Sequence, residues 1–265
     1  MTITPLNKDS ILHAIEAFST EMPINLHVLT EIDSTNQFLK QRPPSALIEV
    51  CCAETQTLGR GRRGNTWHSP YGENIYLSIR WKIPVATLLL SAMGLVVSLA
   101  ILDAIHLIAP DVYIKWPNDL IWNMKKLSGI LVEMITTVSG CQEVIIGVGL
   151  NVSTSASCEA WCSLYDITGK HYDRNKLIAH ILISLNSHLN QFFQQGFGVF
   201  QARWQAADYL YQRAISLTQA HQTFNGIAQG VTTQGLLRLV DNAGIHHMFS
   251  SGDIHITAID GQPRP

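Results

Sequence analysis

An uncharged stretch of 18 residues, Val85 to Leu102, constrains the fold of this chain most strongly. Its length is about the minimum for a helix that spans a membrane. It nevertheless contains Ser91 and Ser98, lacks the usual density of flanking aromatic or basic anchors, and runs amphipathically into Asp103. We therefore predict a helix over about residues 87–108 that is buried against a sheet, and no membrane span.

Composition sets the scale of the protein and the compartment we expect. With 265 residues, 46% of them hydrophobic, the chain can form one α/β core and a small appended domain. A net charge of −2 argues against general binding to nucleic acid or membrane surfaces, so any basic site must be local. Five cysteines without a CxxC pair, and an N-terminus unlike a signal peptide, favour a cytoplasmic protein with reduced thiols.

One such local basic site is the loop Gly59-Arg60-Gly61-Arg62-Arg63-Gly64. Its glycines let the backbone approach a ligand, and its guanidinium groups match phosphate or carboxylate oxygens. Taken alone, the hexapeptide fits a solvated loop at a hairpin tip equally well. It is not a Walker loop, because no Lys-Ser/Thr follows the last glycine.

A second polar cluster, Ser34-Thr35-Asn36, follows a predicted strand over residues 24–29. Asp33 or Ser34 can cap a helix here. The cluster can also present hydroxyl, amide and backbone N–H groups to an uncharged polar ligand. Gln56, just before the basic loop, both donates and accepts hydrogen bonds, which suits an amide or ureido group.

Periodicity predicts an α+β chain of two domains, residues 1–212 and 213–265. The first domain should contain a short N-terminal helix with Phe18 on its apolar face, a long helix over 174–195 and one further helix over 199–211. The predicted strands of the first domain cover 24–29, 46–54, 74–81 (half-buried), 112–116, 120–123 and 144–152, and residues 153–173 are mostly loop. Four short strands, 214–218, 223–231, 236–240 and 254–259, predict a small β-barrel for the second domain.

Five motifs resemble those of the biotin protein ligases, in the same order along the chain, and the resemblance covers roughly residues 24–265. Each motif is weak alone, whereas the ordered set is specific. The motifs are Asp33-Ser34-Thr35-Asn36, Gly59-Arg60-Gly61-Arg62-Arg63-Gly64, Lys115-Trp116-Pro117-Asn118-Asp119, Lys126-Leu127-Ser128-Gly129-Ile130-Leu131-Val132-Glu133 and Gly147-Val148-Gly149-Leu150-Asn151-Val152.

The resemblance implies a central mixed sheet packed by helices, like that of class II synthetases, followed by an SH3-like barrel. It implies the activity of a biotin–[biotin carboxyl-carrier protein] ligase. Such enzymes join biotin to ATP, release pyrophosphate, and pass the biotinyl group from biotinyl-5′-AMP to one lysine of the biotin carboxyl carrier protein of acetyl-CoA carboxylase. ATP, biotin and Mg²⁺ are thus the expected ligands.

The resemblance also implies a role for each matching residue. It assigns catalysis to Arg62 and Lys126, and biotin binding to Ser34, Thr35, Asn36, Gln56, Arg60, Gly61, Arg62, Lys126 and Gly129. Nucleotide binding falls to Arg62, Trp67, Lys115, Asn118, Asp119 and Asn151, with Asn118 and Asp119 at the magnesium ion. Arg63 is expected to be a surface or carrier-facing charge.

The chemistry itself calls for these residue types. A carboxylate that attacks the α-phosphate of ATP brings two anions together, so fixed positive groups are needed at that point. Lys126 and Arg62 can supply them, with Mg²⁺ shielding the triphosphate. Only the register against the following Leu-x-Gly-Ile-Leu favours Lys126 over Lys125. The base that deprotonates the acceptor lysine is not identified by the sequence.

Several alternatives stay open at this point. Fewer than 25 residues precede the first predicted strand, too few for a winged helix-turn-helix, so we expect no repressor function and no DNA partner. A lipoate or octanoyl transferase of the same fold is the nearest rival. A binding protein that has lost catalysis is a third hypothesis. The sequence does not distinguish a monomer from a homodimer.

Overall fold

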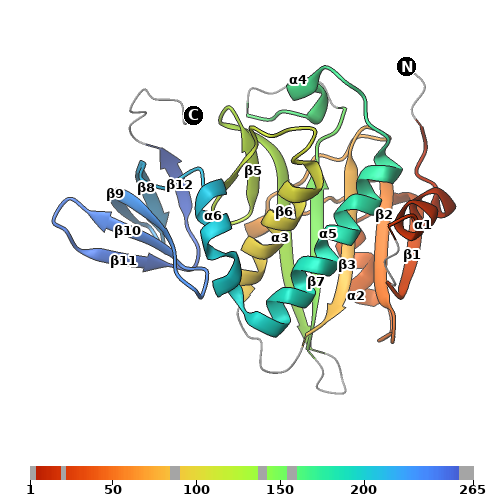
Figure 1. Cartoon of the computed structure of the whole chain (residues 1–265), viewed down its shortest axis with the longest axis horizontal. Coiled ribbons are helices and arrows are strands. Elements are labelled where there is room, and N and C mark those ends of the chain that lie inside the picture. The colour runs from red at the N-terminus through yellow and green to blue at the C-terminus, as the bar shows by residue number, and fades with distance from the viewer. Residues whose placement is uncertain (1–3, 19–21, 84–89, 137–141, 154–159, 257–265) are drawn as a thin grey trace.

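The computed structural model describes residues 4–18, 22–83, 90–136, 142–153 and 160–256. Within these ranges the strands form one seven-stranded mixed sheet and one five-stranded antiparallel sheet (Figure 1). The first domain contains α1 (Lys8–Glu16), β1 (Ile24–Ile32), α2 (Thr35–Gln41), β2 (Ile48–Gln56), η1 (Arg62–Gly64), β3 (Ile75–Lys82), α3 (Leu90–Ile105), β4 (Tyr113–Lys115), β5 (Asp119–Trp122), β6 (Lys125–Thr136), β7 (Gln142–Leu150), α4 (Leu164–Thr168), α5 (Arg174–Gln195), η2 (Phe197–Phe200) and α6 (Gln201–Ala207). The second contains β8 (Ala214–Gln219), β9 (Gln222–Val231), β10 (Leu237–Asp241), β11 (His246–Phe249) and β12 (Asp253–Ile256).

The large sheet has the strand order β1-β2-β3-β7-β6-β5-β4. Its one parallel pair among the described strands is β1 with β2, because α2 carries the chain across between them. Helices α3 and α5 pack together over one face of this sheet, and α2 packs against β2, β3 and β7 on the other (Figure 1). The expected central mixed sheet packed by helices, with a small β domain after it, is confirmed.

Strand β3 differs from the prediction of a half-buried strand. Every residue of β3 except Lys82 is buried. The strand lies in the middle of the sheet, between β2 and β7, with helices on both faces. The polar residues that suggested an exposed face are instead paired inside: Ser78 with Asn36, and Arg80 with Glu143.

The uncharged stretch forms a buried helix, as predicted. Helix α3 begins at Leu90, and the predicted start near residue 87 lies outside the described residues. Side chains from Ala92 to Leu102 on this helix belong to the main hydrophobic core. Among the described residues, no helix has both the length and the apolar character required to cross a membrane.

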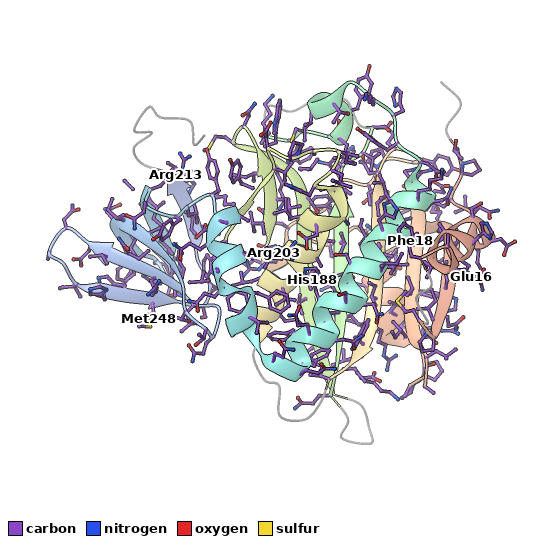
Figure 2. All side chains as sticks on the ribbon, viewed as in Figure 1. Glu16, Phe18, His188, Arg203, Arg213 and Met248 are labelled. Atoms are coloured by element: carbon purple, nitrogen blue, oxygen red, sulfur yellow. The ribbon has the colours of Figure 1, made fainter. Side chains whose placement is uncertain are left out.

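A cluster of three charged or polar side chains ties the helices of this face together. His188 of α5 contacts the Asp103 carboxylate at 2.9 Å, and Arg203 of α6 pairs with the same carboxylate. Figure 2 shows His188 and Arg203 where α5 and α6 approach each other. Burial lowers the pKa of His188. The cluster therefore fixes α3, α5 and α6 in one arrangement.

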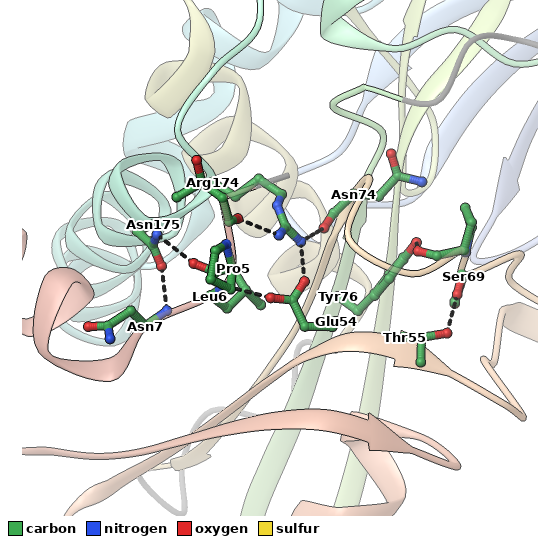
Figure 3. A network of polar contacts seen from close by, with 12 residues as sticks. Pro5, Leu6, Asn7, Glu54, Thr55, Ser69, Asn74, Tyr76, Arg174 and Asn175 are labelled. Carbon is green, nitrogen blue, oxygen red and sulfur yellow. Dashed lines mark hydrogen bonds and ion pairs between the residues drawn. The ribbon is translucent and has the colours of Figure 1, made fainter. Parts of the chain in front are cut away.

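A buried ion pair between β2 and α5 anchors the N-terminal segment (Figure 3). Arg174 Nη1 lies 2.7 Å from Glu54 Oε2, and both side chains are about 5% exposed. Arg174 Nη2 also donates to the carbonyl of Thr4 at 2.9 Å, and the amide of Leu6 donates to Glu54 at 2.5 Å. Removing either charge would leave the other buried without its partner.

Three local expectations were wrong or incomplete. Phe18 is 56% exposed, because α1 ends at Glu16 before its apolar face reaches that residue. The helix expected over 199–211 is a 3₁₀ turn followed by α6, which ends where Asp208 meets Ile114 of β4 in a β-bridge. Strand β11 was not predicted, since His246–Phe249 lacks alternating apolar residues.

The described cysteines agree with the prediction of reduced thiols. Cys51, Cys52 and Cys162 are free and buried, and burial raises the pKa of Cys52 and Cys162 to about 12. Cys141 and Cys158 lie outside the described residues.

Candidate active site

A cavity of about 490 Å³ lies over strands β6 and β7 of the large sheet, where the motifs meet. Its walls are the start of α2, the loop from Arg60 to Trp67, the segment Lys115–Asp119, and strand β12 of the second domain. Strands β6 and β7 contribute the floor through Gly129, Gly147 and Gly149. Every predicted site residue except Asn151 lines this cavity.

The cluster that starts α2 caps this helix and also lines the cavity. Ser34 is the N-cap of α2, with its Oγ accepting from the amide of Gln37 at 3.4 Å. Thr35 donates its backbone N–H to Gln56 Oε1 at 2.9 Å, and its hydroxyl lies 3.1 Å from the same oxygen. The cap and these hydrogen bonds therefore hold Thr35 and Gln56 together at the cavity wall.

Asn36 is held on both sides of its side-chain amide. Its Nδ2 donates to Glu133 Oε2 at 2.8 Å, and Ser78 Oγ lies 2.5 Å from its Oδ1. Its side chain lies directly over Gly147 of β7, where an added Cβ would be 3.0 Å from Asn36 Cγ and closer still to Oδ1. A side chain at position 147 would thus displace Asn36.

The basic loop is closed by its own backbone. The amide of Gly61 donates to the carbonyl of Asn65 at 2.7 Å, and the amide of Trp67 donates to the carbonyl of Gly59 at 2.9 Å. Arg63 adopts a positive φ of 55°, within the tight turn that η1 forms. The loop is therefore a compact turn that directs neighbouring arginines differently.

The arginines of this loop have different partners. Arg62 enters the cavity and donates to Asn118 Oδ1 at 3.0 Å, and burial lowers its pKa, with Arg63 adding to the effect. Arg63 Nη1 lies 2.5 Å from Asp253 Oδ1 of β12, so it contacts the second domain. Arg60 lies 3.6 Å from Glu133. Arg62 is thus the most deeply placed of the three in the cavity.

Trp67 packs onto the floor of the cavity, over two glycines that face each other. Gly129 of β6 and Gly149 of β7 are register partners, and a Cβ at either position would lie within 2.8 Å of the indole ring. The Lys126 ammonium lies 5.4 Å from the centre of this ring. Trp67 Nε1 is buried without a hydrogen-bond partner among the described residues.

Lys126, rather than Lys125, belongs to the cavity. Its Nζ lies 2.7 Å from Asp119 Oδ1, on the facing strand β5. Lys115 lines the same wall, and burial lowers its pKa. Together with Arg62, these side chains place three cationic groups beside one carboxylate, so this part of the cavity is suited to an anion.

Asn151 stands apart from the other predicted residues. Its Nδ2 donates to the carbonyl of Cys162 at 3.0 Å, and its backbone N–H donates to the carbonyl of Leu127 at 3.0 Å. It supports the start of β6 from outside the cavity, and its predicted contact with a nucleotide stays a prediction.

Sequence reasoning missed four groups that lie in or behind the walls. Gly252, Asp253 and His255 reach the cavity from the second domain, and no local motif marked them. Glu133 lies behind Asn36 and ended one of the five motifs, but it received no role. Its place at the end of that motif was the available signal.

The oxygen donors available for a metal ion are few. Asn118 and Asp119, the predicted magnesium ligands, both line the cavity. No cluster of three or more His, Cys, Asp or Glu side chains suited to a metal occurs in the part of the chain that the structure describes. One carboxylate and one amide oxygen fit Mg²⁺ that is held mainly by phosphates and water.

Both parts of the chain match known protein families. Residues 28–151 match the biotin/lipoate A/B protein ligase family, and residues 213–256 match the biotin protein ligase C-terminal domain. The bifunctional ligase/repressor BirA of Escherichia coli is 34% identical over 240 residues, which span 88% of this chain and 74% of BirA. The biotin–[acetyl-CoA-carboxylase] ligase of Mycobacterium tuberculosis is 34% identical over 249 residues, 86% of this chain and 88% of that protein.

Solved structures agree with these relatives. The biotin protein ligase of Aquifex aeolicus, solved in complex with biotin and ATP, superposes with a TM-score of 0.79 at 28% identity. That match covers 88% of this chain and 99% of the Aquifex chain. Since sequence relatives, both domain matches and the fold coincide, the chain belongs to the biotin protein ligase family.

Proposed function

We propose that this protein is an ATP-dependent biotin protein ligase that works in two steps. In the first, the carboxylate of biotin attacks the α-phosphate of ATP, forming biotinyl-5′-AMP and releasing pyrophosphate. In the second, a lysine amine of a biotin carboxyl carrier protein attacks the acyl carbon and AMP leaves. The observation that carries the proposal is the set of Arg62, Lys115 and Lys126 gathered in one cavity beside polar groups suited to a neutral ring.

The polar end of the cavity suits the ureido ring of biotin. Thr35, Asn36 and Gln56 offer amide and hydroxyl groups in fixed positions, and none of them carries a formal charge. A cyclic urea carries N–H donors and a carbonyl acceptor, so it requires both kinds of partner. The neutral, hydrogen-bonding wall therefore favours biotin over a purely apolar lipoyl or octanoyl chain.

The cationic end suits the reacting anions. A carboxylate and a triphosphate repel each other, and positive groups that are already in place lower the barrier to their reaction. Lys126 can contact both the carboxylate of biotin and the α-phosphate, while Arg62 balances charge on the phosphate oxygens. When bound at Asn118 and Asp119, Mg²⁺ would neutralise further charge on the triphosphate.

The basic loop can also protect the reaction intermediate from water. A mixed anhydride such as biotinyl-5′-AMP hydrolyses in water, so the site must exclude solvent until the acceptor arrives. The loop from Arg60 to Trp67 forms a wall of the cavity, and Arg63 contacts Asp253 of β12. Exclusion of water by this loop is supported by its position over the floor of β6 and β7.

Biotin-dependent exchange of pyrophosphate into ATP tests the proposal. The purified chain should catalyse exchange with biotin and not with lipoate. Exchange with lipoate alone would favour the lipoate ligases of the same fold. Binding of biotin without any exchange would favour a binding protein that has lost catalysis.

The unpaired half of β6 supports a homodimer as part of the proposal. Strand β5 pairs with β6 only as far as Gly129. Over the described residues, no strand pairs with the outer edge of β6 from Leu131 to Thr136. Such an edge can pair with its copy across a twofold axis. Sedimentation velocity should show self-association that rises with protein concentration, and a monomer at all concentrations would contradict this part.

A further inference from the structure

We propose that Glu133 is a positioning residue for biotin binding, because it fixes the orientation of the Asn36 side-chain amide. The inference rests on the function proposed above. Glu133 lies on β6, behind Asn36, and the roles assigned so far leave it without one. Its contacts join the polar wall of the cavity to the basic loop.

The hydrogen bonds determine which end of the Asn36 amide faces which neighbour. An ionised carboxylate only accepts, so Glu133 Oε2, at 2.8 Å, requires the amide nitrogen of Asn36. Ser78 can donate to Asn36 Oδ1, 2.5 Å away, on the other side. A flipped amide would put its oxygen against the carboxylate, which is repulsive, whereas Ser78 Oγ could accept from the amide nitrogen and donate to Thr35 Oγ1, 2.7 Å away. Glu133 thus selects one of two orientations that have nearly the same shape.

Glu133 is itself kept in place and ionised. Lys40 Nζ lies 2.6 Å from Glu133 Oε1, and Arg60 of the basic loop lies 3.6 Å from the same oxygen. Asn36 and Lys40 are four residues apart on α2, so they project from one face of the helix toward β6. The Glu133 side chain is 18% exposed, which limits screening of these contacts by solvent.

The orientation matters because Asn36 lines the cavity. One N–H and one lone pair of its amide are not used by Glu133 and Ser78, and they are what a ligand can meet. Reversal of the amide would exchange a donor for an acceptor toward the ureido ring. A mismatch of this kind leaves buried polar groups unpaired and weakens binding by about tenfold to a hundredfold.

Glu133→Gln tests this role with almost no change in volume. The glutamine amide can donate to Asn36 Oδ1 as well as accept from its nitrogen, so the orientation is no longer unique. We expect the dissociation constant for biotin, measured by calorimetry, to rise about tenfold or more. The KM for ATP should stay within about twofold, and the urea midpoint should stay close to that of the wild type. A purely structural role would not separate the two substrates.

Two further variants isolate the contact responsible. Lys40→Met removes the ion pair to Glu133 but keeps the hydrogen bond to Asn36, so biotin affinity should fall by less than about threefold. In an Asn36→Ala background, Glu133→Gln should cause no further loss of biotin affinity, because the amide that Glu133 positions is gone. Three results would each overturn the inference. The first is unchanged biotin affinity in Glu133→Gln, and the second is a loss of biotin affinity in Lys40→Met as large as that in Glu133→Gln. The third is a double variant whose loss of affinity equals the sum of the losses in Glu133→Gln and Asn36→Ala.

Failure of the inference can be told apart from failure of the proposed function. A wild type that does not bind biotin overturns both. A wild type that binds biotin and exchanges pyrophosphate, with a Glu133→Gln variant that does so equally well, overturns only the role of Glu133.

Discussion

Gly149→Ala should weaken ATP binding by displacing Trp67 from the cavity floor. The added methyl carbon would lie 2.6 Å from Trp67 Nε1 and closer to two ring carbons. A normal contact is about 3.5 Å, so the ring or the strand must move by about 1 Å. Since β7 is a central strand, the indole is the part that moves. Overpacking of this kind costs about 1–3 kcal/mol, and because ATP binding must overcome that cost to restore the indole to the floor, the affinity should fall about fivefold to 150-fold.

The assay is equilibrium binding of ATP to the purified variant, with urea unfolding as a check on the fold. Gly198→Ala is the matched control, because a Cβ at Gly198 meets nothing within 4 Å, and it should leave both measurements unchanged. Gly147→Ala should instead weaken the binding of biotin, since its methyl group would collide with the Asn36 side chain. Normal ATP affinity in a stably folded Gly149→Ala variant would refute the role of Trp67 in holding the nucleotide.

Three further predictions concern charge. Lys126→Ala should reduce formation of the adenylate about a hundredfold or more, measured in a single turnover, whereas Lys125→Ala should have little effect because Lys125 does not line the cavity. Arg174→Met should lower the free energy of unfolding in urea by about 3–5 kcal/mol by leaving Glu54 buried and unpaired; a loss below about 1 kcal/mol would contradict the buried pair. Burial alone would raise the pKa of Glu133, but hydrogen bonds from Lys40 and Asn36 outweigh it and hold the pKa below its ordinary value of 4.5. The stability that ionised Glu133 contributes is therefore fully present above pH 4.5 and is lost as the pH falls through the lowered pKa. Glu133→Gln should accordingly reduce the pH dependence of the free energy of unfolding on the acid side.

The sequence was informative wherever function and local geometry coincide. Residues from Ser34 to Asn36 follow a strand and cap a helix, and the basic loop connects two strands. Residues at strand ends on one side of a sheet are brought together by the sheet itself. The site residues themselves came from the resemblance to a known family, and all five of its motifs contribute residues that line the cavity.

Contacts between distant segments were not predictable in the same way. Asp253 and His255 reach the cavity only because the second domain packs beside the first, and nothing near them in sequence indicates this. Glu133 meets Asn36 across 97 positions of sequence. The burial of β3 likewise depends on helices on both of its faces, whereas its alternating residues are typical of a surface strand.

The central claim is that the cavity activates biotin as an adenylate. The most direct test is mass spectrometry of the purified chain after incubation with biotin, ATP and Mg²⁺, without an acceptor protein. We expect biotinyl-5′-AMP bound to the protein, pyrophosphate released in equal amount, and loss of both in Lys126→Ala. Binding of biotin and ATP with no adenylate formed would contradict the account.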